Sequence, residues 1–370
     1  MSVPIARRNT FFQKGKLILS VLSIGASLAM ILLLLGFREG LYSALTAYVD
    51  NLDVDLIATQ SGNEGVVSAN SVLPSGIHDE LEELADAQEA GHIVVAGVIF
   101  TIGDDKSPIV LVGYEPDSGL GDPWNLGEGR YLEQDDEIML DSWLAQRSRI
   151  KIGDTVELLG REFKVVGLTS GTASWMAPYA FVTLPAAQQA LGLVDSVSYH
   201  LLSLNDEASF GTAKDAIETR FPNVKAIQPS QIADTDRRAI AAVMDRPINV
   251  LLFVAVIIGV AVMALTSYTS IMDRLREYGL LKAVDARPLR LNIVVIQESL
   301  LNSSLGIIIG VALAYLSAAL IMANWPQFNV TILPDSVWKI AVLGLIMTLV
   351  AAILPIRRLD RIDVLDVFKA

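Results

Sequence analysis

The histidines are the first residues to examine for chemistry, because imidazole serves both as a general base and as a metal ligand. His78, His92 and His200 are the only histidines in the 370-residue chain, which has no cysteine. They are far apart and match none of the ligand spacings typical of metal sites, and His200 alternates within a predicted strand. We therefore predict no metal site. The absence of cysteine excludes disulfides and thiolate chemistry.

Two carboxylate runs, Asp104–Asp105 and Asp135–Glu137, are the other candidates for acid–base chemistry. General acid–base catalysis needs a positioned partner and a shifted pKa, whereas a solvated turn needs only charge. Ser170 and Ser174 flank Gly171, but no G-x-S-x-G nucleophile elbow is present. We predict no catalytic residue and do not expect this chain to be an enzyme.

Nucleotide binding by this chain is not expected either. The phosphate-binding loop G-x-x-x-x-G-K-[ST] places backbone N–H groups and a lysine around the phosphates. Gly15 and Lys16 match its end only in part, because Leu17 follows them and the first glycine is missing.

The charges of the chain are divided unevenly along the sequence. Residues 37–247 hold 33 acidic and 14 basic side chains, a net charge of −19, and the remainder holds 8 acidic and 14 basic ones, a net charge of +6. The mean hydropathy is +0.47, and 52% of the residues are hydrophobic. This composition argues against disorder, and the acidic excess argues against nucleic-acid binding.

Four apolar runs are long enough to cross the roughly 30 Å hydrocarbon core of a bilayer. We assign them to residues 17–37, 247–272, 291–322 and 339–356. The first run is longer than the apolar part of a cleaved signal peptide, so we interpret it as an anchor. The sequence predicts an α-helical membrane protein with four transmembrane helices and an inserted mixed α+β extracytoplasmic domain.

Lysine and arginine near the ends of the spans predict the orientation, because they gather on the cytoplasmic side. They are frequent in residues 1–16, 273–290 and 357–370, and absent from the short loop at 323–338. Both termini are therefore expected in the cytoplasm of a cell whose inner membrane the chain crosses. Residues 38–246 are expected outside.

The inserted domain has the patterns of a mixed α and β fold. Residues 154–168 alternate between apolar and polar side chains on either side of Gly160, which predicts a hairpin. Residues 77–90 and 208–221 have the spacing of amphipathic helices.

The loop between the second and third spans reads R-E-Y-G-L-L-K-A-V-D-A and resembles the R-E-x-G-x-L-K-A-x-G-A motif of FtsX/MacB-like (type VII) ABC transporter permeases. Asp285 stands where that family usually has glycine. The tail P-I-R-R-L-D-R-I-D-V-L is similar to the family's ending, and residues 1–16 are similar to its amphipathic entry helix. The order of one span, a large outer domain and three further spans also matches, without a fused ATPase.

This resemblance implies a permease subunit of an ABC exporter that works as a homodimer in membrane lipid, with cytosolic ATPase subunits that hold ATP and Mg²⁺. No cofactor is expected in this chain. The cargo would be hydrophobic or amphipathic. Alternatives within the family are haem efflux, with haem as cargo, and an FtsX-like mechanical transmitter that activates an extracytoplasmic partner; a periplasmic adaptor is a further possible partner. The resemblance assigns ATPase coupling to residues of the 273–290 loop, namely Arg274, Arg276, Glu277, Gly279, Leu281 and Lys282.

Polar and small residues inside the third span are the remaining candidates. Glu298, next to Gln297, is a charged residue near a span interior, where charge is costly, so we expect it to pair with Arg290 or a lysine. Gly306 and Gly310 form a G-x-x-x-G pattern, which permits close helix packing.

Overall fold

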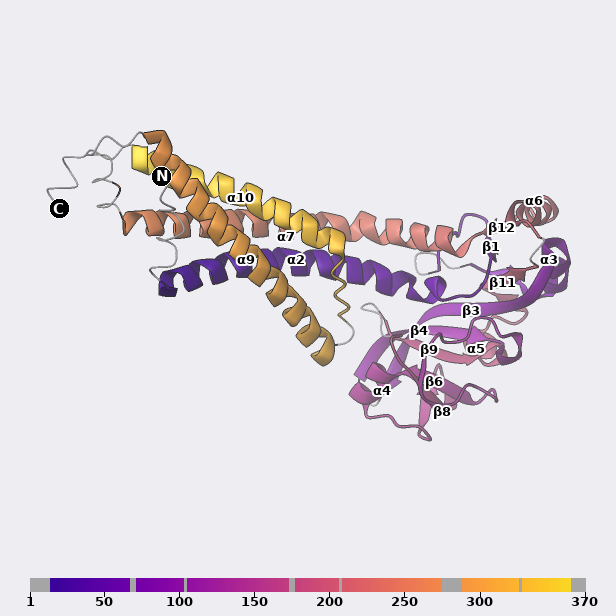
Figure 1. Cartoon of the computed structure of the whole chain (residues 1–370). Coiled ribbons are helices and arrows are strands. Elements are labelled where there is room, and N and C mark those ends of the chain that lie inside the picture. Colours follow the sequence, from indigo (N-terminus) through magenta and orange to yellow (C-terminus); the bar gives the residue numbers. More distant parts are fainter. Residues whose placement is uncertain are drawn as a thin grey trace. The chain divides into compact units, whose positions relative to one another are not determined.

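The computed structural model describes residues 14–66, 71–102, 105–172, 177–205, 208–274, 278, 288–325 and 328–360. The chain divides into two compact units (Figure 1). The helical unit comprises Met1–Glu39, Arg246–Asn324 and Val330–Ala370. The sheet unit comprises Gly40–Asp245 and Trp325–Asn329.

Four long helices dominate the helical unit: α2 (Lys14–Asp50), α7 (Pro229–Met272), α9 (Pro288–Asn324) and α10 (Pro334–Asp360). Each is long and apolar enough to span a membrane. Together with the mixed sheet of the other unit, they confirm the predicted fold class. The predicted short outer loop, 323–338, overlaps the end of α9 at Asn324 and the start of α10 at Pro334.

The helices that flank the sheet unit in sequence are longer than a membrane span requires. The division between the two units falls inside α2, after Glu39, and inside α7, after Asp245. Neither helix is interrupted there. The chain therefore enters and leaves the sheet unit through continuous helices rather than through flexible linkers.

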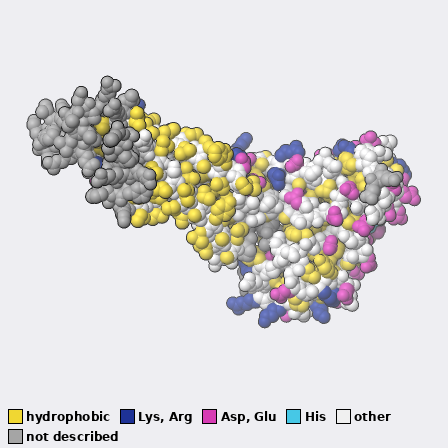
Figure 2. Space-filling model, viewed as in Figure 1, with side chains coloured by type: hydrophobic (Ala, Val, Ile, Leu, Met, Phe, Trp, Pro, Cys, Tyr) yellow, Lys and Arg dark blue, Asp and Glu magenta, His cyan; other side chains and the backbone are white. Residues whose placement is uncertain are grey.

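Side chains from all four helices form the core of the helical unit. Leu28 and Leu32 of α2, Met263 of α7, Ala314 of α9 and Met347 of α10 are buried in one cluster. Many apolar side chains on the outer faces stay exposed, among them Phe253 and Ile308. Figure 2 shows these hydrophobic side chains gathered over the helices, whereas acidic side chains are scattered over the sheet unit. Such a surface suits lipid contact.

The strands of the sheet unit form one mixed sheet, whose order is β12-β1-β11-β3-β4-β9-β6-β8-β5, with β7 paired to β8. β2 and β10 form a separate two-stranded ribbon. The strand bounds are β1 Leu56–Gln60, β2 Leu73–Pro74, β3 Ala87–Ile102, β4 Asp105–Tyr114, β5 Leu126–Gly129, β6 Glu137–Asp141, β7 Thr155–Leu158, β8 Arg161–Thr169, β9 Tyr179–Thr183, β10 Ser196–Val197, β11 Tyr199–Leu204 and β12 Val224–Ile227.

Short helices and turns connect these strands. Their bounds are η1 Ser75–Ile77, α3 His78–Ala85, η2 Pro116–Ser118, α4 Ser142–Ser148, α5 Leu184–Leu191 and α6 Phe210–Arg220. The predicted hairpin at 154–168 is confirmed as β7 and β8, with Leu159 and Gly160 both at positive φ in the turn. The second predicted helix is confirmed as α6.

The helix predicted over residues 77–90 is too long at its C-terminal end. α3 ends at Ala85, because Asp86 has the left-handed conformation (φ 50°) that terminates a helix. The chain then continues as β3, where Ala87 pairs with Leu204 of β11. Pairing in the sheet therefore overrides the helical pattern of the last residues.

The sheet buries side chains on both faces, as the alternation along its strands requires. On β1, Leu56 and Ala58 belong to one core and Ile57 to the other. The first core includes buried side chains of α3, α4, α5 and α6. The second core includes side chains from the end of α2 and the start of α7. The two long helices thus supply part of the core of the sheet unit.

Candidate functional site

A buried ion pair joins the residues just after α7 to the first third of α9. Arg274 lies two residues after Met272, the last residue of α7, and its Nη1 lies 3.2 Å from Oε1 of Glu298. Both side chains are 9% exposed. Ser270, one turn before Arg274, donates a hydrogen bond of 3.2 Å to the same carboxylate oxygen. Among the described side chains, the basic partner of Glu298 is therefore Arg274. The predicted partner Arg290 has a side chain outside the described residues.

The ion pair lies next to a small apolar cluster formed by Ile271, Tyr278, Leu291 and Val295. Tyr278, only 4% exposed, belongs to the segment between α7 and α9. These contacts hold Tyr278, the described residue within that segment, against side chains of α7 and α9. A movement of the segment is therefore expected to move the ends of α7 and α9 as well.

A cavity of about 300 Å³ opens beside the ion pair. Its lining is apolar in part, with Leu17 and Leu265, and polar in part, with Asp273, Arg274 and Glu298. Moving a charge pair out of water strengthens the attraction between the charges but costs hydration free energy. Because part of the cavity lining is polar, that cost is smaller here.

Glycines allow α2 and α9 to approach closely. A β-carbon on Gly310 would lie 2.8 Å from the Gly25 carbonyl oxygen, and one on Gly306 would lie 2.5 Å from Cγ2 of Ile24. Real side chains do not fit at these distances. The G-x-x-x-G pattern therefore packs α9 against α2 within one chain, with Gly25 as its counterpart.

The C-terminal end of α2 is embedded in the core of the sheet unit. Tyr48 is 1% exposed, and its hydroxyl donates a hydrogen bond of 2.8 Å to the Gly121 carbonyl. Its ring stacks on Tyr179 at 5.7 Å and lies 6.3 Å from the Phe181 ring. Tyr179 and Phe181 belong to β9, so the last turn of α2 is packed directly on the central strands.

The N-terminal end of α7 is held in the same core. Ile232 is fully buried and Ala233 is 5% exposed. Asp236, also fully buried, accepts a hydrogen bond of 2.9 Å from the backbone N–H of Val66. Within the sheet unit, α2 and α7 also pack on each other through Leu45 and Met244, among others. Both helices are therefore anchored in the sheet unit at their far ends.

The coupling residues predicted in the 273–290 loop lie mostly outside the described residues. Arg276, Glu277, Gly279, Leu281 and Lys282 belong to this group. Arg274 is described and points at Glu298. On α9, Gln297 is exposed while the adjacent Glu298 is buried, so only the acid faces the helix bundle.

The three histidines lie close together in the sheet unit, although they are far apart in sequence. His78 begins α3, His92 lies in β3 and His200 in β11, and one ligand atom of each lies within 4.8 Å of the others. Their separation in sequence therefore does not keep them apart in the fold. Sequence spacing could not reveal the cluster, because antiparallel pairing places His92 directly opposite His200.

Known protein families account for almost the whole chain. Residues 17–220 match the MacB-like periplasmic core domain, and residues 249–364 match the FtsX-like permease C-terminal family. The first match alone covers more than half of the chain. This chain belongs to the MacB/FtsX-like ABC transporter permeases. The permease is thus a membrane protein with a large outer domain, which is the sheet unit.

Relatives of the permease span its full length. An uncharacterised ABC transporter permease of Mycobacterium tuberculosis is 24% identical over 98% of both chains. Another from Mycobacterium bovis is 21% identical over 97% of both. The solved periplasmic region of MacB from Actinobacillus actinomycetemcomitans is 15% identical and covers 50% of the permease and 94% of that chain, at a TM-score of 0.39.

Besides the histidine cluster, sequence reasoning missed two further features of the permease. One is the anchoring of α2 through Tyr48, whose residue type alone does not reveal its burial. The other is Gly25, which could have been found as a small-residue cluster, Gly25-Ala26-Ser27, in the first span. Both depend on contacts between segments distant in sequence.

Proposed function

We propose that this permease couples ATP hydrolysis by a separate cytosolic ATPase to movement of its outer domain, and that this movement exports or extracts a hydrophobic or amphipathic cargo. The observation that carries the proposal is the anchoring of α2 and α7. Each helix runs unbroken across the boundary of the two units, and each ends in the core of the outer domain. A continuous helix transmits a displacement that a flexible linker would absorb.

The input end of this path is the segment between α7 and α9. The Arg274–Glu298 pair and the cluster around Tyr278 hold its flanks. We propose that Arg276, Glu277 and Lys282 present charges to the ATPase, while the ion pair passes the displacement to α7 and α9. The complete transporter would be a homodimer of this chain with two ATPase subunits.

The negative charge of the outer domain favours some charge classes of cargo over others. Residues 37–247 carry a net charge of −19, which repels anions at distances shorter than about 8–10 Å at physiological salt. A neutral, amphipathic or cationic cargo is therefore favoured.

An extracytoplasmic protein partner, as in a mechanical transmitter, would use the same helices. Stimulation of ATPase activity by small amphipathic ligands rather than by a protein would separate the two.

Removing the charges of the coupling segment should abolish assembly with the ATPase. We expect R276A/E277A/K282A to fold and insert normally but to lose co-purification of the ATPase subunit, because three charged contacts disappear from one short segment. The measurement is the ATPase-to-permease ratio after affinity purification.

The matched control removes two other basic residues, Arg357 and Arg358, which are exposed in the last turn of α10. The R357A/R358A variant should keep the ATPase. Normal co-purification with the triple variant, or equal loss in both variants, would contradict a specific docking role of the segment.

A further inference from the structure

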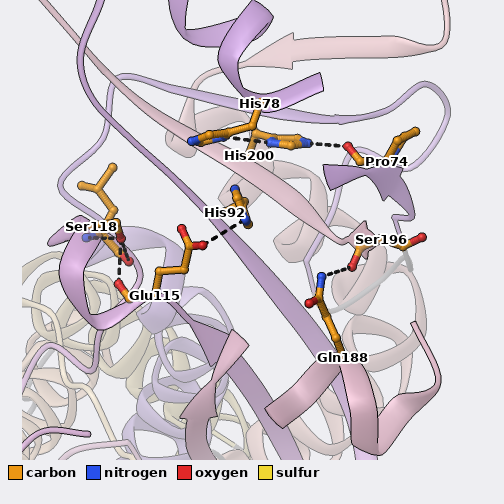
Figure 3. A network of polar contacts seen from close by, with 9 residues as sticks. Pro74, His78, His92, Glu115, Ser118, Gln188, Ser196 and His200 are labelled. Carbon is orange, nitrogen blue, oxygen red and sulfur yellow. Dashed lines mark hydrogen bonds and ion pairs between the residues drawn. The ribbon is translucent and has the colours of Figure 1, made fainter. Parts of the chain in front are cut away.

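The three histidines of the permease form a cluster that none of the roles above uses. Figure 3 shows the rings of His78, His92 and His200 facing one another, with Glu115 and Pro74 at the periphery. The ring centroids of His78 and His92 are 4.5 Å apart, and each lies 5.6 Å from the His200 ring. α3, β3 and β11 thus each contribute one imidazole.

Hydrogen bonds at the outer edge fix the tautomer of His200. Its Nε2 lies 3.2 Å from the Pro74 carbonyl oxygen. A carbonyl only accepts, so Nε2 must carry the hydrogen, and Nδ1 keeps a free lone pair. That Nδ1 lies 3.3 Å from Nδ1 of His78. Two nitrogens that both bind a tetrahedral zinc ion at about 2.0–2.1 Å are about 3.3–3.4 Å apart.

His92 is oriented in the same way by a carboxylate. Its Nε2 lies 3.2 Å from Oε1 of Glu115, which follows β4. Its Nδ1 is buried and has no hydrogen-bond partner among the described residues. In Figure 3 this nitrogen faces the other two rings. A carboxylate that accepts the outer N–H of a histidine is the usual support of a histidine metal ligand, because it fixes the ring and raises its basicity.

Acidic side chains lie around the three imidazoles. Burial, together with the nearby His92 and His78, lowers the pKa of His200 to about 3. Burial and His92 also lower the pKa of His78, against the opposing effect of Glu115, Glu82 and Asp79. These three carboxylates supply negative charge around the rings.

We propose that His78, His92 and His200 bind one divalent transition-metal ion of the Zn²⁺ class, which ties α3 to β3 and β11 in the outer domain. Imidazole ligands suit Zn²⁺, Cu²⁺ and Ni²⁺, whereas Ca²⁺ and Mg²⁺ prefer oxygen. Three protein ligands leave a fourth position for water. The ligand atoms lie within 4.8 Å of one another, so the rings need to close by no more than about 1.5 Å to reach the spacing of a tetrahedral zinc site.

A network of hydrogen bonds without metal is the competing explanation. It accounts for the short contact between His78 and His200, but it leaves Nδ1 of His92 buried without a partner. Buried polar atoms in folded proteins are nearly always satisfied. An ion satisfies all three inward nitrogens at once, and therefore explains the arrangement better.

The test is Zn²⁺ binding by the full-length permease in lipid nanodiscs, purified with an affinity tag that contains no histidine. Isothermal titration and metal analysis after dialysis should give one Zn²⁺ per chain, and Ca²⁺ and Mg²⁺ should not bind. H78N and H92N should each lose binding, while E115Q should weaken it by roughly 10–100-fold, as expected for a supporting carboxylate. The control E128Q removes an exposed carboxylate of the same domain and should bind as wild type.

Two further readouts keep the test independent of folding. Circular dichroism without metal should be unchanged in H78N, whose side chain is only half-buried. X-ray absorption of the bound Zn²⁺ should show nitrogen ligands with imidazole scattering. No binding by the wild type, retention of binding in both histidine variants, or an oxygen-only ligand shell would overturn the proposal.

Discussion

Replacing Glu298 by glutamine should destabilise the helical unit by about 3–5 kcal/mol and reduce ATPase stimulation in the assembled transporter. Arg274 and Glu298 are each 9% exposed, so the substitution removes the negative charge that faces the buried guanidinium of Arg274. Breaking a buried pair from one side is more costly than removing it entirely. Chemical unfolding of the purified permease in detergent measures the first effect, and the reconstituted complex measures the second.

Two variants control for this interpretation. Q297A changes the neighbouring, exposed residue and should alter stability by less than about 0.5 kcal/mol. The double variant R274Q/E298Q removes both charges and should be more stable than E298Q alone. If E298Q unfolds like the wild type, the pair does not hold α7 to α9, and the proposed path from the coupling segment fails.

Replacing Tyr48 by alanine should destabilise the outer domain by about 3–5 kcal/mol, because a fully buried aromatic ring is removed from between α2 and β9. The end of α2 would then be released from the strands that hold Tyr179 and Phe181. We expect faster amide hydrogen exchange in β9 and loss of ATP-driven movement of the outer domain, while ATP hydrolysis itself continues.

The matched variant is Y48F, which keeps the ring and removes only the hydroxyl that donates to the Gly121 carbonyl. One hydrogen bond is worth about 0.5–1.5 kcal/mol, so Y48F should remain folded and coupled. Equal behaviour of Y48A and Y48F, or wild-type exchange in β9 of Y48A, would show that Tyr48 does not anchor the helix.

Most of the fold follows from local patterns in the sequence. An uncharged run of about 20 residues that crosses a bilayer must form an α-helix to satisfy its backbone hydrogen bonds, so the four long helices were predictable. The hairpin around Gly160 was equally clear, because the turn needs the positive φ that glycine adopts readily. The end of α3 could not be predicted in this way, because the pairing of Ala87 with Leu204 outweighs the helical pattern there.

The contacts that matter for function depend on tertiary structure instead. Glu298 was recognisable as an unusual buried acid, but its partner Arg274 is 24 residues away and its choice depends on how α7 and α9 pack. The histidine cluster needs the register of β3 and β11 together with the turn that starts α3. No spacing in the sequence encodes such a juxtaposition.

The central claim, that ATP moves the outer domain, is tested most directly by distance measurement. The chain has no cysteine, so V194C introduces one unique label site, at a side chain that is 73% exposed on the outer domain. A spin label there reports the separation of the two outer domains in the proposed homodimer by pulsed electron paramagnetic resonance. We predict that the distance distribution shifts between the nucleotide-free and ATP-bound complexes in nanodiscs. The same distribution in both states, or no dipolar coupling at all, would contradict the account.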